Sequence, residues 1–149
     1  MEFKSLADLR CIADVTSDIP KLTREEKIEI WVKALARDPA RSLTPLPEIE
    51  WAPAHMRPAL RADGSPLSVA FEQPMLRAAG LAGDRLGDAM AFFELSEAEA
   101  HDTLCSCHYG RSMTAGAAAR RIRRVAGSGL VSRVRSWLSK SLGLRPVPT

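Results

Sequence analysis

A proline-rich segment sets the strongest limit on how this chain can fold. Six of its ten prolines lie within residues 39–66, and a proline inside a helix removes a backbone hydrogen bond and clashes with the preceding turn. A long helix therefore cannot cross this segment. Because apolar residues are interleaved with the prolines, we expect an ordered, extended strap that packs across neighbouring helices, with Trp51 as its anchor.

Short helices are predicted on both sides of the strap. A capping box at residues 23–26, in which a threonine and a glutamate each bond to the other's backbone, starts a helix that Pro39 ends. A second capping box at residues 96–99 starts a helix that is predicted to reach Tyr109, with Gly110 closing it.

Further helix starts lie between the two capping boxes. Ser65 before Pro66 is a typical N-cap followed by proline in the first turn of a short helix, which Pro74 breaks or restarts and Gly80 ends. Asp84 is the expected cap of a helix that contains Gly87. Glycine inside a helix costs roughly 1 kcal/mol relative to alanine, so Gly87 indicates the close approach of a neighbouring helix.

The remaining helices are expected at residues 6–15, 115–126 and 129–142. No run of residues alternates between polar and apolar with the β-branched enrichment of a strand, so no sheet is expected. The sequence thus predicts an all-α fold, a single compact domain of six or seven short helices with a Pro-rich extended strap at about residues 39–66.

Charge is distributed unevenly along the chain. Residues 1–110 contain 12 Lys and Arg against 18 Asp and Glu, whereas residues 111–149 contain 9 Lys and Arg and no acid. The formal net charge of +3 therefore combines a body of −6 with an arm of +9. We divide the chain into an acidic helical body, residues 1–110, and a basic two-helix arm, residues 111–149, within the same domain.

The basic arm carries the residues that we expect to bind a partner or a polyanion. Its first predicted helix has four arginines spread around the axis, which leave only a narrow stripe of small residues for packing. Its second predicted helix has an apolar face and a basic polar face, as interfacial and partner-binding helices do. The candidate binding residues are Arg120, Arg121, Arg123, Arg124, Arg133, Arg135, Trp137, Leu138 and Lys140.

Three interpretations of the basic arm remain open. In the first, both helices pack on the body, whose carboxylates pair with the arginines. In the second, the arm is attracted to a polyanion, either nucleic acid or an anionic membrane surface. In the third, the last helix docks into a groove on a partner protein.

Residues 101–108 contain the densest group of reactive side chains. On a continuous helix, His101, Cys105 and His108 would share one narrow strip, and imidazole with thiolate suits zinc. The two histidines would be separated by about 10.5 Å of helix rise, too far for one ion unless the helix unwinds near Cys107. The candidate ligands are therefore His101, Cys105, Cys107 and His108, and zinc is the one cofactor they suggest. The alternatives are buried cysteines with hydrogen-bonded histidines, or a reactive or redox thiol.

Other features indicate the class of protein. The odd number of cysteines, two of them one residue apart, indicates a reducing compartment. The first residues lack the apolar stretch of a signal peptide, and no apolar run reaches the roughly 20 residues of a transmembrane segment. The cluster also lacks a recognisable oxyanion hole, so an enzyme is not expected.

We therefore expect a small cytoplasmic accessory or regulatory protein that is not an enzyme. It would act through helical surfaces and the basic amphipathic arm, contacting a partner protein, nucleic acid or an anionic membrane surface. The alternative is a zinc-binding or redox-linked protein that uses the His/Cys cluster.

Overall fold

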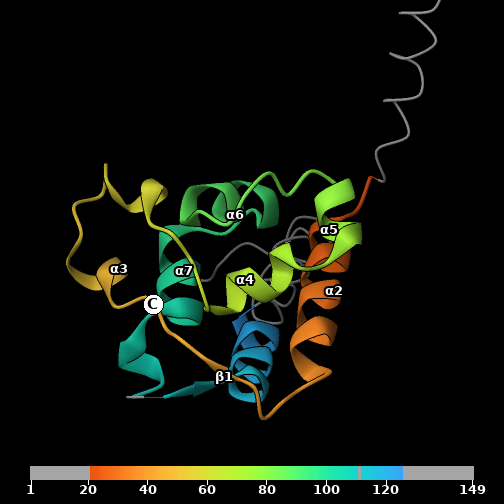
Figure 1. Cartoon of the computed structure of the whole chain (residues 1–149). Helices are drawn as coiled ribbons and strands as arrows, with labels where there is room; N and C mark the ends of the chain where they lie inside the picture. The colour runs from red at the N-terminus through yellow and green to blue at the C-terminus, as the bar shows by residue number, and fades with distance from the viewer. Residues whose placement is uncertain (1–20, 111, 126–149) are drawn as a thin grey trace, which may run out of the picture.

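The capping box predicted at residues 23–26 begins helix α2 (Arg24–Ala36) in the computed structural model, which describes residues 21–110 and 112–125 (Figure 1). The Thr23 hydroxyl accepts a hydrogen bond from the Glu26 amide at 3.2 Å, and the Glu26 carboxylate accepts one from the Thr23 amide at 2.7 Å. The helix buries the apolar face that its sequence spacing predicts, namely Ile28, Trp31, Val32, Ala34 and Leu35.

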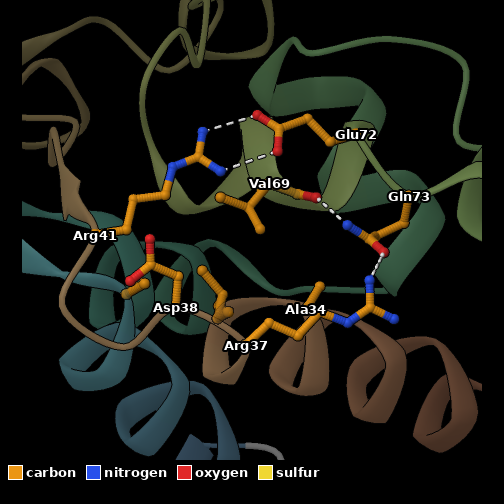
Figure 2. Close-up of a pocket in the computed structure, with 9 residues that line it drawn as sticks. Ala34, Arg37, Asp38, Arg41, Val69, Glu72 and Gln73 are labelled. Carbon is orange, nitrogen blue, oxygen red and sulfur yellow. Dashed lines mark hydrogen bonds and ion pairs between the residues drawn. The ribbon is translucent and has the colours of Figure 1, made fainter.

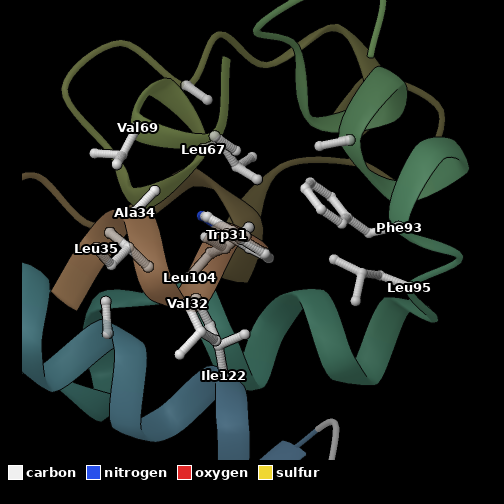
Figure 3. Close-up of a cluster of buried hydrophobic side chains, with 14 of the residues drawn as sticks. Trp31, Val32, Ala34, Leu35, Leu67, Val69, Phe93, Leu95, Leu104 and Ile122 are labelled. Atoms are coloured by element: carbon white, nitrogen blue, oxygen red, sulfur yellow. The ribbon is translucent and has the colours of Figure 1, made fainter. Parts of the chain in front are cut away.

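Trp31 of α2 occupies the centre of the hydrophobic core (Figure 3). Its ring is fully buried, stacks on Phe93 with 4.6 Å between ring centroids, and donates a hydrogen bond of 2.8 Å from Nε1 to the Pro66 carbonyl oxygen. The nitrogen of the buried indole is therefore hydrogen-bonded. The ring also connects α2 to the helix that begins at Pro66 and to the helix that ends at Phe93.

Three helices follow the strap: α4 (Pro66–Phe71), α5 (Pro74–Ala78) and α6 (Leu86–Phe93). The predicted starts of α4 and α5 are confirmed, and the Ser65 hydroxyl accepts from the Leu67 amide. The predicted cap of α6 is wrong, because the N-cap is Arg85 and makes no side-chain cap bond. Asp84 instead pairs with Arg61 of the strap at 3.6 Å, and its carbonyl accepts from the Ala62 amide at 3.0 Å.

The close approach predicted at Gly87 is present, but the neighbour is the 3-10 helix η1 (Arg57–Ala59) of the strap. A Cβ atom at Gly87 would lie 2.8 Å from Cβ of Pro58 and 3.0 Å from its carbonyl oxygen. Glycine is therefore required by the packing of α6 against η1.

The strap is ordered, and it differs from the prediction in two ways. It contains a short helix, α3 (Glu48–Trp51), as well as η1, and its strand β1 (Ser42–Leu43) pairs antiparallel with β2 (Met113–Thr114). The prediction that no sheet forms is thus wrong, because two-residue strands are too short to show an alternating pattern.

Trp51 is not the anchor of the strap, because 72% of its surface is exposed. Leu46 and Ile49 are buried instead. Trp51 follows Ile49 by two positions, which is about 200° around a helix, so burial of Ile49 turns Trp51 outward.

Helix α7 (Glu97–Leu104) begins at the predicted capping box but ends well before Tyr109. Cys105 is extended, with φ −71° and ψ 140°, and the 3-10 helix η2 (Ser106–His108) follows. In a continued helix the Leu104 carbonyl would accept from the His108 amide. Here it accepts from Leu46 of the strap at 2.8 Å, and the His108 amide donates to the Cys105 carbonyl at 3.3 Å.

Residues 115–125 form the first helix of the predicted arm, and this helix belongs to the core of the body. As predicted, it buries a stripe of small residues with one larger side chain, consisting of Ala115, Ala118, Ala119 and Ile122. The helices predicted at residues 6–15 and 129–142 lie outside the described residues.

Together the described residues form a mostly helical single domain with seven α-helices and one two-stranded sheet, so the predicted all-α class is confirmed. None of the helices within residues 21–110 and 112–125 has the length and apolar character needed to cross a membrane.

Candidate functional site

The interruption of α7 at Cys105 brings three side chains together at the surface. His101 comes from the last turns of α7, whereas Cys107 and His108 come from η2. One potential ligand atom from each residue lies within 4.8 Å of the other two. We call His101, Cys107 and His108 the His/Cys/His cluster. His101 and His108 are half-buried, and Cys107 is exposed.

Short contacts join the three side chains of the His/Cys/His cluster, and they use both ring nitrogens of His101. Nε2 of His108 lies 3.3 Å from Nδ1 of His101, and Sγ of Cys107 lies 3.8 Å from Nε2 of His101. The two rings are nearly perpendicular, at 88°. Two nitrogen ligands that each lie about 2.0–2.1 Å from a tetrahedral zinc ion are about 3.3–3.4 Å apart. The separation of the two imidazole nitrogens matches two zinc ligands, and it is also that of the hydrogen bond recorded between the two rings. Cys107 contacts the other nitrogen of His101, and since one ion can take only one nitrogen of a ring, the Cys107 thiol would have to move to share an ion with both histidines.

Asp102 places a carboxylate beside the same cluster. Its Oδ1 atom lies 3.3 Å from Nε2 of His108. Because Asp102 approaches the same nitrogen that faces His101, it would act as a further ligand beside His108 rather than orient the ring through its other nitrogen, and carboxylate oxygen is itself a zinc ligand. Asp102 was not among the predicted ligands, because its approach to His108 depends on the interruption of the helix at Cys105.

The pKa shifts within the cluster favour metal binding by His108 and oppose metal binding by Cys107. Burial lowers the pKa of His108, assisted by the nearby Arg121 guanidinium, while Asp102 acts in the opposite direction. His108 therefore stays neutral, with a lone pair that can bind a metal ion, down to a lower pH than an ordinary histidine does. A hydrogen bond with the Cys105 thiol, together with desolvation, raises the pKa of Cys107. Cys107 is thus a thiol at neutral pH, and a metal ion must displace its proton in order to bind.

Cys105 does not join the cluster, although it was among the four candidate ligands. It is fully buried, because the extended backbone at this position turns its side chain into the core. Its thiol interacts with that of Cys107, and both cysteines are free. The structure therefore brings together three of the four candidate ligands.

Tyr109 and Arg121 fix the cluster against helix 115–125. The Tyr109 hydroxyl donates to the Thr103 carbonyl at 2.7 Å, and burial raises the pKa of Tyr109 to about 12. Arg121 lies over the Tyr109 ring, 5.9 Å from its centroid, and donates from Nε to the Asp102 carbonyl oxygen. Arg121 is thus held by the body, which separates it from the other arginines of the predicted binding set.

The other predicted binding residues fall into two groups. Arg120, Arg123 and Arg124 are exposed on helix 115–125. The remaining five lie outside the described residues; they are Arg133, Arg135, Trp137, Leu138 and Lys140.

A cavity of about 230 Å³ lies elsewhere, between α2, the start of the strap and α4 (Figure 2). Both terminal guanidinium nitrogens of Arg41 donate to the Glu72 carboxylate, at 2.8 and 2.9 Å, and Arg37 donates to Gln73 at 3.3 Å. The two arginines that line the cavity are therefore already paired.

Comparison of the chain with protein-family models, with curated proteins and with solved structures gave no match.

Proposed function

We propose that this protein binds a divalent transition-metal ion, with zinc as the best fit, through His101, Cys107 and His108. The observation that carries the proposal is the convergence of two imidazoles and a thiol within 4.8 Å at the end of α7. Nitrogen and sulfur ligands together favour zinc over magnesium or calcium, which prefer oxygen. The surface position of Cys107 gives an ion direct access to the site.

Three protein ligands leave a fourth position on a tetrahedral ion. Asp102 is the nearest carboxylate that the structure records beside the cluster, and water or a group from a partner are the alternatives. We propose a metal-linked accessory or regulatory role rather than catalysis. Two free thiols suit a reducing compartment, and this supports our expectation of a cytoplasmic protein.

Metal titration of the full chain tests the proposal. After treatment with a chelator and its removal, we expect added Zn²⁺ to raise the unfolding temperature, with a stabilisation of about 2.7 kcal/mol at a free concentration 100 times Kd. With Co²⁺, we expect a thiolate-to-cobalt charge-transfer band. His101→Ala and Cys107→Ser should each remove both effects.

The chain offers matched controls for these variants. His55 is the third histidine and is exposed, so His55→Ala should bind metal as the wild type does. Cys105→Ala should retain the cobalt band, because the band arises from Cys107. The absence of a band and of stabilisation in the wild type would overturn the proposal, as would equal losses in His55→Ala and His101→Ala.

A further inference from the structure

Helix 115–125 presents three arginines on its outer face. At 100° per residue, Arg120, Arg123 and Arg124 fall within about 100° of the helix circumference. The buried side chains, such as Ala118 and Ile122, occupy the opposite side. The three arginines are exposed and lie on a helix that is fixed to the core. We call Arg120, Arg123 and Arg124 the arginine face.

The arginine face carries charge that the rest of the described chain does not neutralise. The structure records no ion pair between these three arginines and any residue of 21–110 or 112–125. By contrast, four arginines of the body are paired with carboxylates, namely Arg24, Arg41, Arg57 and Arg61. The sequence from residue 111 onward also contains no acid. The interpretation that carboxylates of the body neutralise the arm therefore finds no support, for these three, among the carboxylates of residues 21–110.

We propose that the arginine face binds the phosphate backbone of a nucleic acid. Guanidinium groups bind phosphate with paired hydrogen bonds, which ammonium groups do not match. Arg120 and Arg124 are separated by about 6 Å along the helix, nearly two steps of 3.4 Å per nucleotide, so the three guanidinium groups can reach about three successive phosphates of one strand. Such contacts position a protein without reading the base sequence.

The packing of helix 115–125 favours nucleic acid over a membrane surface. A helix that lies in a bilayer interface inserts an apolar face between the lipids. The apolar side of this helix is occupied, because Ala115, Ala118, Ala119 and Ile122 are buried in the core. Only the charged side is available to a partner.

Arg121, on the same helix, has a structural role, and this supports the proposal that the arginine face binds phosphate. Its contacts with the Asp102 carbonyl and the Tyr109 ring hold the helix to the body, so the three neighbouring guanidinium groups are presented from a fixed base. This separation of one structural arginine from three outward ones is not visible in the sequence, where all four look alike.

Fluorescence anisotropy with a labelled 20-base-pair DNA duplex of mixed sequence tests the proposal. The full chain is used in the presence of a chelator, so that metal binding plays no part. We expect binding that weakens steeply with salt, and the triple variant Arg120→Gln, Arg123→Gln, Arg124→Gln should bind at least about tenfold more weakly at low salt. The slope of log K against log salt should fall by about 3 in magnitude, about one unit for each lost phosphate contact.

The matched control removes the same charge elsewhere. The triple variant Lys33→Gln, Arg77→Gln, Arg85→Gln replaces one cation near each of α2, α5 and α6, and should keep nearly the full affinity and slope. Thermal unfolding followed by circular dichroism verifies that both triple variants are folded. Equal losses in the two triple variants, or wild-type affinity in the arginine-face variant, would overturn the proposal. So would binding to phosphatidylserine vesicles without binding to the duplex.

Discussion

Helices α2 and α7 begin in the same way and end differently. Each starts at a capping box, formed by Thr23 and Glu26 in one helix and by Ser96 and Glu99 in the other. α2 then continues for 13 residues, and its last cap, Arg37, keeps helical backbone angles. α7 stops after eight residues at the extended Cys105. The comparison teaches that local side chains set where these helices start, whereas a distant segment sets where α7 stops.

The different endings give the two helices different roles. α2 keeps one uninterrupted apolar face and places Trp31 at the centre of the core. At the end of α7 the Leu104 carbonyl accepts a hydrogen bond from the strap. The chain that follows folds back, so that Cys107 and His108 lie close to His101. Four predictions test this comparison.

The largest effect is expected for the core role of α2. Trp31→Ala should lower the free energy of unfolding by about 3–5 kcal/mol, because it leaves a cavity beside Phe93 and removes the donor to the Pro66 carbonyl. Trp51→Ala is the control and should change it by less than about 0.5 kcal/mol, since Trp51 is exposed. Urea unfolding measures both, and similar losses would contradict the assignment of Trp31 to the core and Trp51 to the surface.

The next prediction concerns the ending of α7. Leu46→Pro removes the amide that holds the Leu104 carbonyl, so we expect α7 to lose its fixed end and zinc affinity to fall by at least about tenfold. Leu46→Ala loses the same buried side chain but keeps the amide, and should retain zinc affinity despite lower stability. Isothermal titration calorimetry with Zn²⁺, at a temperature where both variants are folded, measures their zinc affinities. Equal zinc affinities would show that the strap does not shape the site.

A smaller difference is expected between the two capping boxes. Glu99 also pairs with Arg24 of α2 at 2.8 Å, and the two side chains are only 24% and 10% exposed. Glu99→Gln should therefore cost about 1–2 kcal/mol of unfolding free energy, because it leaves a half-buried guanidinium without its charged partner. Glu26→Gln keeps the cap acceptor at an exposed site and should cost less than about 0.5 kcal/mol. If chemical denaturation gives equal costs, the pair between α2 and α7 contributes nothing.

The smallest effect concerns pH. Burial holds the pKa of His108 below its ordinary value of 6.5, so the unfolded chain takes up a proton first as the pH falls. In the presence of a chelator, stability should therefore decrease as the pH falls through about 6.5 towards the lower pKa of the folded state. His108→Gln should reduce this decrease and His55→Gln should not. A decrease of the same size in wild type and His108→Gln would assign it to other groups.

Most of the helix starts could be predicted from the sequence, because each depends on neighbouring residues. The two capping boxes and Ser65 before Pro66 act over three positions or fewer, and all three are confirmed. Asp84 is the exception, and there the strap competes for its carboxylate through Arg61. The sheet was missed for a related reason, because each of its strands has two residues and is fixed by a partner far along the chain.

The candidate site was predictable in composition but not in geometry. The spacing of His101 and His108 required the helix to unwind, and it does, two residues before the predicted position at Cys107. That shift places Cys105 in the core and leaves Cys107 at the surface. The Leu104 carbonyl accepts instead from the Leu46 amide, which lies more than fifty residues away and has no local signature in the sequence. The same limit hid the role of Arg121, whose partners are on α7 and beyond.

The contribution of helix 115–125 to the core has a consequence for synthesis of the protein. Met113 pairs with the strap and Ile122 fills the interior, so the helices made earlier cannot complete their packing until this segment leaves the ribosome. Contacts between such distant parts of a chain slow folding, because a large loop must close before they form. During most of its translation, the nascent chain therefore exposes part of the apolar face around Trp31. A product truncated after Gly110 would expose the same face and would be a target for chaperones and proteases.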